Sequence, residues 1–258
     1  MVMSRRLLYR SDFWEIARPR HPLTAGHVVI RLSDPSIDFA LPSAADWLLC
    51  HQLARTALAK VLGASQCAVM FAYQWHPLGA GLGEPVAESS TPTFHLFGRW
   101  AGETTTPGQQ LSLPAHRRAV LPESGLEVTD KAIREALRSE RPTADRTAEH
   151  AAEAAVVPLL EPTPMVRTVA AGPRHTVLEP VGGAASIREF RPADLLAVAA
   201  SLRALPLSAG VSGFSCLALE SPALQTPLRI HALGRSAAED VNPLLELLRS
   251  PEVSLALL

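Results

Sequence analysis

The chain has 258 residues, of which 47% are apolar, so it is long enough to form one large or two small domains with a substantial core. The formal net charge is −1 and the pI is near 6.8, so the overall charge gives no reason to expect a nucleic acid or an anionic membrane as partner. No apolar run reaches the length of an export signal or a membrane span, and we therefore expect a cytoplasmic protein.

The first half of the chain predicts two strands, a helix and two further strands. Ser43 is a suitable N-cap for the helix, whose apolar residues recur at helical spacing as far as Gly63. Residues 75–90 contain several Gly and Pro residues, which indicates a loop. The strands are predicted at 13–17, 27–32, 67–73 and 93–100.

The second half predicts the same order of elements in a shorter form. Pro192 suits the first position of a helix that ends near Leu205, because a proline has no N–H that would lack a partner there. Residues 129–155 are rich in Ala, Glu and Arg and predict a connecting helix that is partly solvated. Strands are predicted at 165–169, 175–181, 212–219 and 228–233. The predicted domains are 1–128, a helical linker at 129–160, and 161–258.

Short motifs recur in the same order in both halves, which indicates that the chain contains two copies of one unit. The segment Thr91–Arg99 returns 136 residues later with His, Gly and Arg in identical spacing, at His231, Gly234 and Arg235. Pro-Arg-His occurs both at 19–21 and at 173–175, and Ser-Ile occurs both at 36–37 and at 186–187.

These motifs resemble a known superfamily. Residues 18–30, Arg-Pro-Arg-His-Pro-Leu-Thr-Ala-Gly-His-Val-Val-Ile, resemble the early hairpin of the histidine-triad (HIT) superfamily, and 91–99 resembles a degraded form of its His-x-His-x-His strand. Two units in one chain are similar to the galactose-1-phosphate uridylyltransferase branch. The resemblance implies an α+β fold with two HIT-like units, each an antiparallel sheet with a helix, packed as an intramolecular pseudo-dimer. It also implies a transferase or hydrolase that acts on a nucleotide or sugar phosphate.

The match to the triad is incomplete. His95 falls on the third histidine and Arg99 on the arginine that follows, but Thr91 and Thr93 occupy the first and second positions. In the family the middle histidine is the nucleophile, and a threonine hydroxyl can replace it only if a base activates it. We therefore expect His95 to act as a general acid or base, with Thr93 beside it in the catalytic group. His76, in the glycine-rich loop, is a candidate for the missing base.

Further residues are expected to bind the substrate. His21 and His27 flank the hairpin turn, which in the resembling fold lies near the nucleotide, and Thr91 and Arg99 belong to the triad strand. The second unit contributes Arg229, His231 and Arg235. The alternatives are that the histidines are structural residues of a non-catalytic binding or assembly protein, or that the pocket serves a substrate without phosphate.

Other chemistry has little support in the sequence. Neither zinc-ligand spacing nor a Gly-x-Ser-x-Gly, His-Glu-x-x-His or dinucleotide-binding motif occurs, so no metal or cofactor is expected. Cys50, Cys67 and Cys216 are odd in number and widely spaced, which is typical of free thiols in a reducing compartment. The expected partner is a small, phosphate-bearing molecule, and the chain is expected to be a monomer or a homodimer.

Overall fold

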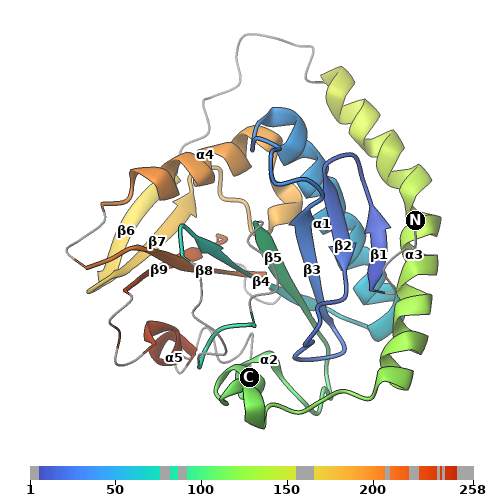
Figure 1. Ribbon diagram of the computed structural model, residues 1–258. Helices are drawn as coiled ribbons and strands as arrows, with labels where there is room; N and C mark the ends of the chain where they lie inside the picture. The colour runs from blue at the N-terminus through green and yellow to red at the C-terminus, as the bar shows by residue number, and fades with distance from the viewer. Residues whose placement is uncertain are drawn as a thin grey trace.

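The protein is an α+β molecule built on one antiparallel sheet of nine strands (Figure 1). The computed structural model describes residues 6–75, 82–86, 92–154, 166–206, 210–220, 227–236, 239 and 242–248. The strand order is β1-β2-β3-β5-β4-β8-β9-β7-β6, and every neighbouring pair is antiparallel. None of the described helices combines the length and the hydropathy that crossing a membrane requires.

The described residues form nine strands, five α-helices and two short 3₁₀ turns. The strands are β1 (Leu7–Arg10), β2 (Trp14–Ala17), β3 (His27–Leu32), β4 (Gln66–Tyr73), β5 (Thr93–Arg99), β6 (Val166–Gly172), β7 (His175–Pro180), β8 (Gly213–Glu220) and β9 (Ile230–Arg235). The helices are α1 (Leu41–Leu62), α2 (Pro107–Leu111), α3 (Glu123–Ala154), α4 (Pro192–Ala204) and α5 (Pro243–Leu248), with short 3₁₀ turns η1 (Ala115–Arg117) and η2 (Ile187–Glu189).

The sheet has the same strand order on both sides of its central β4–β8 pair. Moving outward, β4 is followed by β5, β3 and β2, and β8 is followed by β9, β7 and β6. Helix α1 connects β3 to β4 just as α4 connects β7 to β8. Met70 lies opposite Leu217 at the middle of the central pair. The two halves of the sheet therefore have matching strand orders on either side of this pair.

The two faces of the sheet carry separate apolar clusters, because side chains alternate along each strand. The cluster on one face joins sheet residues such as Trp14 and Phe214 to residues of α1 and α4, among them Trp47 of α1. The opposite face contains Met70 and Leu217, and it is covered by residues of α2, α5 and the hairpin before β3. Figure 1 shows α3 along the edge of the molecule beside β1, where it also packs on α1.

Helix α1 begins earlier than predicted. Its N-cap is Ala40, and Ser43 lies at the third helical position, where its hydroxyl accepts a hydrogen bond from the Ala40 N–H at 2.9 Å. The prediction of Ser43 as N-cap is therefore wrong. Pro42 tolerates this earlier start because the first helical turn needs no N–H from it. Gly63 ends the helix in the left-handed conformation (φ 69°), as its position in the sequence predicts.

Helix α3 begins earlier than the predicted linker helix, at Glu123, inside the predicted first unit. Its first half is partly solvated as predicted, with one face packed and the other exposed. Ile133, Ala136 and Leu137 are buried against the core. These three residues are spaced for one helical face, but the surrounding Ala, Glu and Arg residues hide that pattern in the sequence.

Strand β1 and the short helices α2 and α5 were not predicted.

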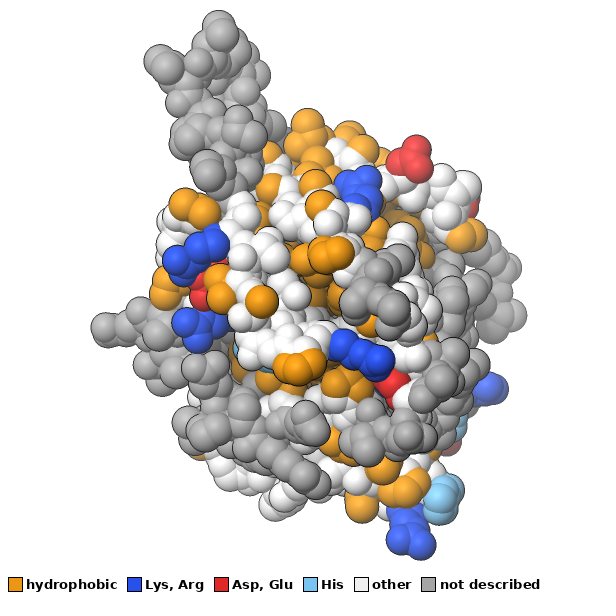
Figure 2. Space-filling model, turned by 90° about the vertical axis from the view of Figure 1, so that its left-hand side faces the viewer, with side chains coloured by type: hydrophobic (Ala, Val, Ile, Leu, Met, Phe, Trp, Pro, Cys, Tyr) orange, Lys and Arg blue, Asp and Glu red, His pale blue; other side chains and the backbone are white. Residues whose placement is uncertain are grey.

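The surface at the β6 edge combines exposed apolar side chains with a small group of ion-paired residues. Figure 2 shows apolar side chains scattered over the described part of this face, with cationic groups beside acidic ones. Strand β6 is exposed along most of its length, and Val169 and Val181 are exposed.

The three cysteines are free and buried, as their spacing predicts.

Candidate functional site

Two histidines of the first half form a hydrogen-bonded pair on the face opposite α1. Strands β3 and β5 place Val29 opposite His95, so His27, two residues before Val29, is a diagonal neighbour of His95 on the same face. The two rings meet with His27 Nε2 at 3.0 Å from His95 Nδ1. His27 is buried and His95 is half-buried. The predicted site residues His27 and His95 therefore act as a unit.

The hydrogen bonds fix which ring nitrogens carry protons. Burial lowers the pKa of His95 to about 4, and burial together with the positive charge of nearby groups lowers the pKa of His27 well below its ordinary value. Both rings are therefore neutral at pH 7. The Leu23 N–H donates to His27 Nδ1 at 3.1 Å, so the His27 proton is on Nε2 and is donated to His95 Nδ1. His95 accordingly carries its own proton on Nε2.

The hairpin that supplies Leu23 is fixed by a buried arginine. One Nη of Arg18 donates to the carbonyl oxygens of Ala25 and His27, at 2.8 and 2.5 Å. The same guanidinium pairs with the buried Asp130 of α3, with its Nε at 2.9 Å from Oδ1. Gly26 is required in this turn, because a Cβ there would lie 2.3 Å from the Gly98 carbonyl oxygen. Arg18 thus positions the histidine pair and is not available as a ligand-binding group.

The second half contains a matching pair of histidines. His175 Nε2 lies 3.1 Å from His231 Nδ1, and His231 lies opposite Val177 as His95 lies opposite Val29. Burial lowers the pKa of His175 and lowers that of His231 to about 4. His175 therefore corresponds in position to His27. The Pro-Arg-His motif in the sequence instead equates His175 with His21. His95 and His231 share one face of the sheet, separated by Met70 of β4 and Leu217 of β8.

The arginines predicted to grip an anion already have carboxylate partners. Arg99 and Glu103 form a buried ion pair, and burial raises the pKa of Glu103. Arg235 is equally buried and pairs with Glu84 and Glu239. Arg229 pairs with Glu179 at the exposed edge of the sheet, with its Nε 3.0 Å from Oε1. An anionic ligand would have to compete with these carboxylates, so the binding roles predicted for Arg99, Arg229 and Arg235 have no support in the geometry.

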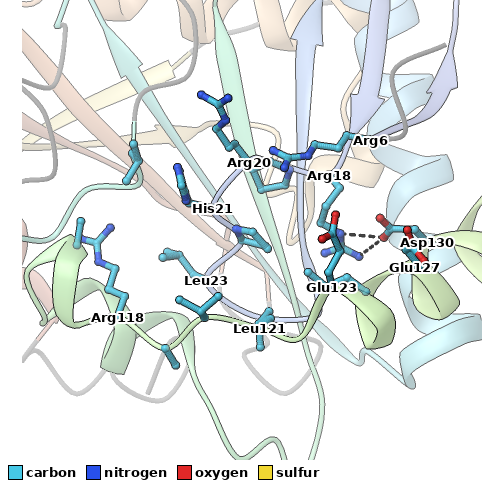
Figure 3. A pocket seen from close by; sticks show the side chains of 17 residues that line it. Arg6, Arg18, Arg20, His21, Leu23, Arg118, Leu121, Glu123, Glu127 and Asp130 are labelled. Atoms are coloured by element: carbon cyan, nitrogen blue, oxygen red, sulfur yellow. Dashed lines mark hydrogen bonds and ion pairs between the residues drawn. The ribbon is translucent and has the colours of Figure 1, made fainter. Parts of the chain in front are cut away.

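A cleft of about 500 Å³ opens beside the same hairpin (Figure 3). Its walls are the hairpin from Arg18 to Leu23, the segment from Ala115 to Leu121, and the first turns of α3. Leu23 belongs both to this wall and to the chain of hydrogen bonds that ends at His95. The cleft has a volume typical of small-molecule sites. His21 lines it, but His27, His95 and Thr93 are not among its lining residues.

Charges are sorted within the cleft. Arg20, His21 and Arg118 lie on one side, and Glu123, Glu127 and Asp130 lie on the other, beside Arg18 (Figure 3). Arg6 extends toward the cationic side from the start of β1. The Arg118 guanidinium donates to the Leu113 carbonyl oxygen at 3.1 Å, and burial lowers its pKa. Guanidinium groups beside an imidazole are the groups that recognise phosphate and carboxylate oxygens.

Another polar cluster lies on the helix face, where β8 ends against α1. Burial by itself raises the pKa of Glu220, but His51 and Arg55 outweigh it and lower that pKa to about 2. Glu220 Oε2 lies 3.1 Å from His51 Nε2, while Oε1 lies 3.3 Å from Arg55 and accepts from Ser186. His51, Cys67 and Glu220 offer metal-ligating atoms within 4.8 Å of one another. The carboxylate is already occupied and Arg55 repels a cation, so the cluster suits an ion-pair network better than a metal.

The predicted site residues are thus divided among several places. The structure brings His27 and His95 together, places His21 in the cleft, and puts His231 in the second pair. Thr93 lies on β5 opposite Arg31 and shares the face of His95. His76 and Thr91 lie outside the described residues. Sequence reasoning missed Arg6 and Arg118, which reach the cleft from segments far apart in the chain and belong to no motif.

Comparison with solved structures finds partial similarities. The structure is similar to a hypothetical histidine triad nucleotide-binding protein from Sulfolobus tokodaii, with a TM-score of 0.37 and 13% identity over 53% of this chain and 85% of that chain. It is also similar to a HIT-like protein involved in cell-cycle regulation from Bartonella henselae, solved with an unknown ligand, with a TM-score of 0.31 and 20% identity over 50% and 85%. Neither a family model nor a curated protein matches the chain.

Proposed function

We propose that this protein binds a phosphate-bearing small molecule, of nucleotide or sugar-phosphate type, in the cleft beside the hairpin. The observation that carries the proposal is the gathering of Arg20, His21 and Arg118 on one side of a cavity of about 500 Å³. The acidic side of the cleft, formed by Glu123 and Glu127, provides acceptors for hydroxyl or amino groups of the same ligand. Such a ligand has its charge at one end and its donors at the other.

The state of His95 favours binding over acid–base turnover at that residue. Its Nδ1 lone pair accepts the His27 proton and its Nε2 carries a proton, so neither nitrogen can serve as a base. With a pKa of about 4, roughly one His95 in a thousand is protonated at pH 7, which makes it a poor acid. A threonine at the nucleophile position, Thr93, supports the same conclusion.

Isothermal titration calorimetry with a nucleoside monophosphate and the matching nucleoside tests the binding. The nucleoside monophosphate is expected to bind at least tenfold more tightly than the nucleoside. Arg20→Ala and Arg118→Ala are each expected to weaken binding by about 10- to 100-fold, since each would remove a charge-assisted hydrogen bond worth roughly 1.5 to 3 kcal/mol. Arg229→Ala is the matched control, because Arg229 lies on the exposed edge of the second half. Equal affinity for the nucleoside, or unchanged binding in both cleft variants, would refute the proposal.

A transferase or hydrolase in this cleft is the second candidate, and the place of His21 favours it. His21 is exposed and stands beside Arg20 and Arg118, so an imidazole faces the position in which a phosphate would bind. If turnover of a nucleotide or sugar phosphate is found, His21→Ala should abolish it and His95→Ala should leave it largely intact. The opposite result would restore the role that the sequence predicts for His95.

We also infer that the two halves are tandem HIT-like units packed as a pseudo-dimer, the arrangement of the galactose-1-phosphate uridylyltransferase branch. The symmetric strand order and the two histidine pairs support this. So do Arg174 and Gly26, which precede the two equivalent histidines and whose carbonyl oxygens accept from the Gly234 and Gly98 N–H groups. Cysteines introduced at Met70 and Leu217 should form a disulfide within the monomer, because these positions face each other at the centre of the sheet.

A further inference from the structure

We propose that the α4–β4 corner, the region where α4 packs over the end of β4, is a binding site for a neutral, apolar small molecule with an aromatic ring. A cavity of about 580 Å³ lies there, on the face of the sheet opposite the histidine pairs. Its floor consists of the buried residues Trp14, Leu32, Val198 and Leu202. The cavity opens to the surface, and its largely apolar lining needs an explanation.

The explanation comes from the equivalent corner of the other half. There, α1 packs over the end of β8, and the space is filled by Trp47, His51 and Glu220. Trp47 stacks on His51 with ring centroids 5.3 Å apart, and His51 reaches Glu220. We call this the α1–β8 corner. A large ring and a buried polar network occupy the space there.

Equivalent positions follow from the helix starts and the strand registers. Ser43 and Asp194 both lie at the third position of their helices, so Trp47 corresponds to Val198 and His51 to Leu202. Glu220 and Tyr73 are the last residues of the two central eight-residue strands. In the α4–β4 corner a valine therefore replaces an indole ring, and a leucine and a tyrosine replace the hydrogen-bonded His51–Glu220 pair. The smaller side chain opens the cavity and the loss of charge makes it apolar.

The lining specifies the chemistry of the ligand. Phe39, Phe71 and Phe94 are half-buried around the cavity, and Phe94 packs against Phe71 at 5.1 Å and against Trp14 at 5.8 Å between ring centroids. Aromatic rings offer both faces and edges to a flat ligand. The charged side chains among the described lining residues are Asp38 and Arg203, and both are exposed. A charged ligand would lose its hydration inside without gaining a partner, so the site selects neutral molecules.

The neutral fluorophore N-phenyl-1-naphthylamine, titrated into the full-length protein, tests this site. Saturable binding at one site, with a Kd in the micromolar range, is expected. Ala199→Trp, which places an indole in the cavity wall, should weaken binding by at least tenfold. Ala200→Trp is the matched control, because Ala200 is exposed on the same helix and does not line the cavity. The absence of saturable binding, or an equal effect of the two substitutions, would overturn the proposal.

A second measurement avoids dependence on the folding of the Ala199→Trp variant. In the unsubstituted protein, NMR should detect contacts between the bound fluorophore and the ring protons of Tyr73, which lines this cavity. Contacts with residues of the hairpin cleft instead would also overturn the proposal. A nucleoside monophosphate should not displace the fluorophore, because the proposed ligands occupy separate cavities.

Discussion

The α1–β8 corner and the α4–β4 corner occupy equivalent positions in the sheet but differ in what fills them. The first contains Trp47 and the polar network of His51, Arg55 and Glu220, and the second contains an apolar cavity. The strand order is the same around both corners, so we attribute the difference to the size and charge of the side chains at corresponding positions. One corner holds a stabilising polar network, and the other holds the proposed ligand site.

The strongest test of this comparison removes the charge from the α1–β8 corner. Glu220→Gln should lower the free energy of unfolding by about 4 kcal/mol, since the half-buried Arg55 and the buried His51 would lose the carboxylate that pairs with them. Urea denaturation at pH 7 measures the effect. Tyr73→Phe, at the equivalent position of the other corner, is the control and should change stability by less than 1 kcal/mol. A loss below 1 kcal/mol for Glu220→Gln would show that the network does not stabilise the corner.

A second prediction makes the filled corner resemble the empty one. Trp47→Val should destabilise the protein by about 3 kcal/mol, because it removes a buried ring and leaves a void beside His51. Trp47→Phe keeps most of the volume and removes an indole N–H that has no hydrogen-bond partner among the described residues. It should therefore cost less than 1 kcal/mol. Similar losses for both variants, measured in urea, would contradict the packing argument.

These corners also show where sequence reasoning ends. Most strands and helices could be predicted from apolar periodicity and from Gly and Pro at turns, and the two His-Gly-Arg segments lie on strands β5 and β9 as predicted. The pairing of Glu220 with His51 could not be predicted, because the two residues come from different halves and meet only when β8 lies beside β4. A void leaves no trace in a sequence unless the equivalent filled position is known.

The candidate site shows the same limit. His27 and His95 were predicted, but as ligand-binding and catalytic groups, because nothing in the sequence indicates that their rings bond to each other. Arg99 and Arg235 stand in the expected spacing, but the acidic partners Glu103 and Glu239, four residues later, neutralise them. This i,i+4 pattern is present in both halves and could have been recognised as a pair of buried ion pairs.

The histidine pairs predict a third, smaller effect, which depends on pH. His95 and His231 have pKa values of about 4 in the folded protein and about 6.5 when unfolded, so the unfolded chain binds more protons between these values. The contribution of these two histidines to the free energy of unfolding is therefore fully present above pH 6.5 and is lost as the pH decreases toward 4. Each histidine should account for a loss of about 2 kcal/mol between pH 7 and pH 5.

Urea denaturation across that range measures the loss. The His95→Asn and His231→Asn variants should each show a shallower dependence on pH, and the two reductions should add because the residues are on separate strands. Glu220 does not interfere, since its depressed pKa affects stability only below pH 4.5. A slope that is unchanged in both variants would mean that these rings do not titrate as their burial implies.

The smallest effect is expected where the second half carries charge on its surface. Glu179 pairs with Arg167 and Arg229 at the edge of the sheet, and those two arginine side chains are 68% and 47% exposed. Water and salt screen such pairs, so Glu179→Gln should lower stability by less than 1 kcal/mol, and 0.5 M NaCl should reduce even that difference. Glu179→Gln removes one carboxylate by the same substitution as Glu220→Gln, so the two losses compare burial directly. Equal losses for the two variants would show that enclosure between α1 and β8 does not set the strength of the ion-pair network.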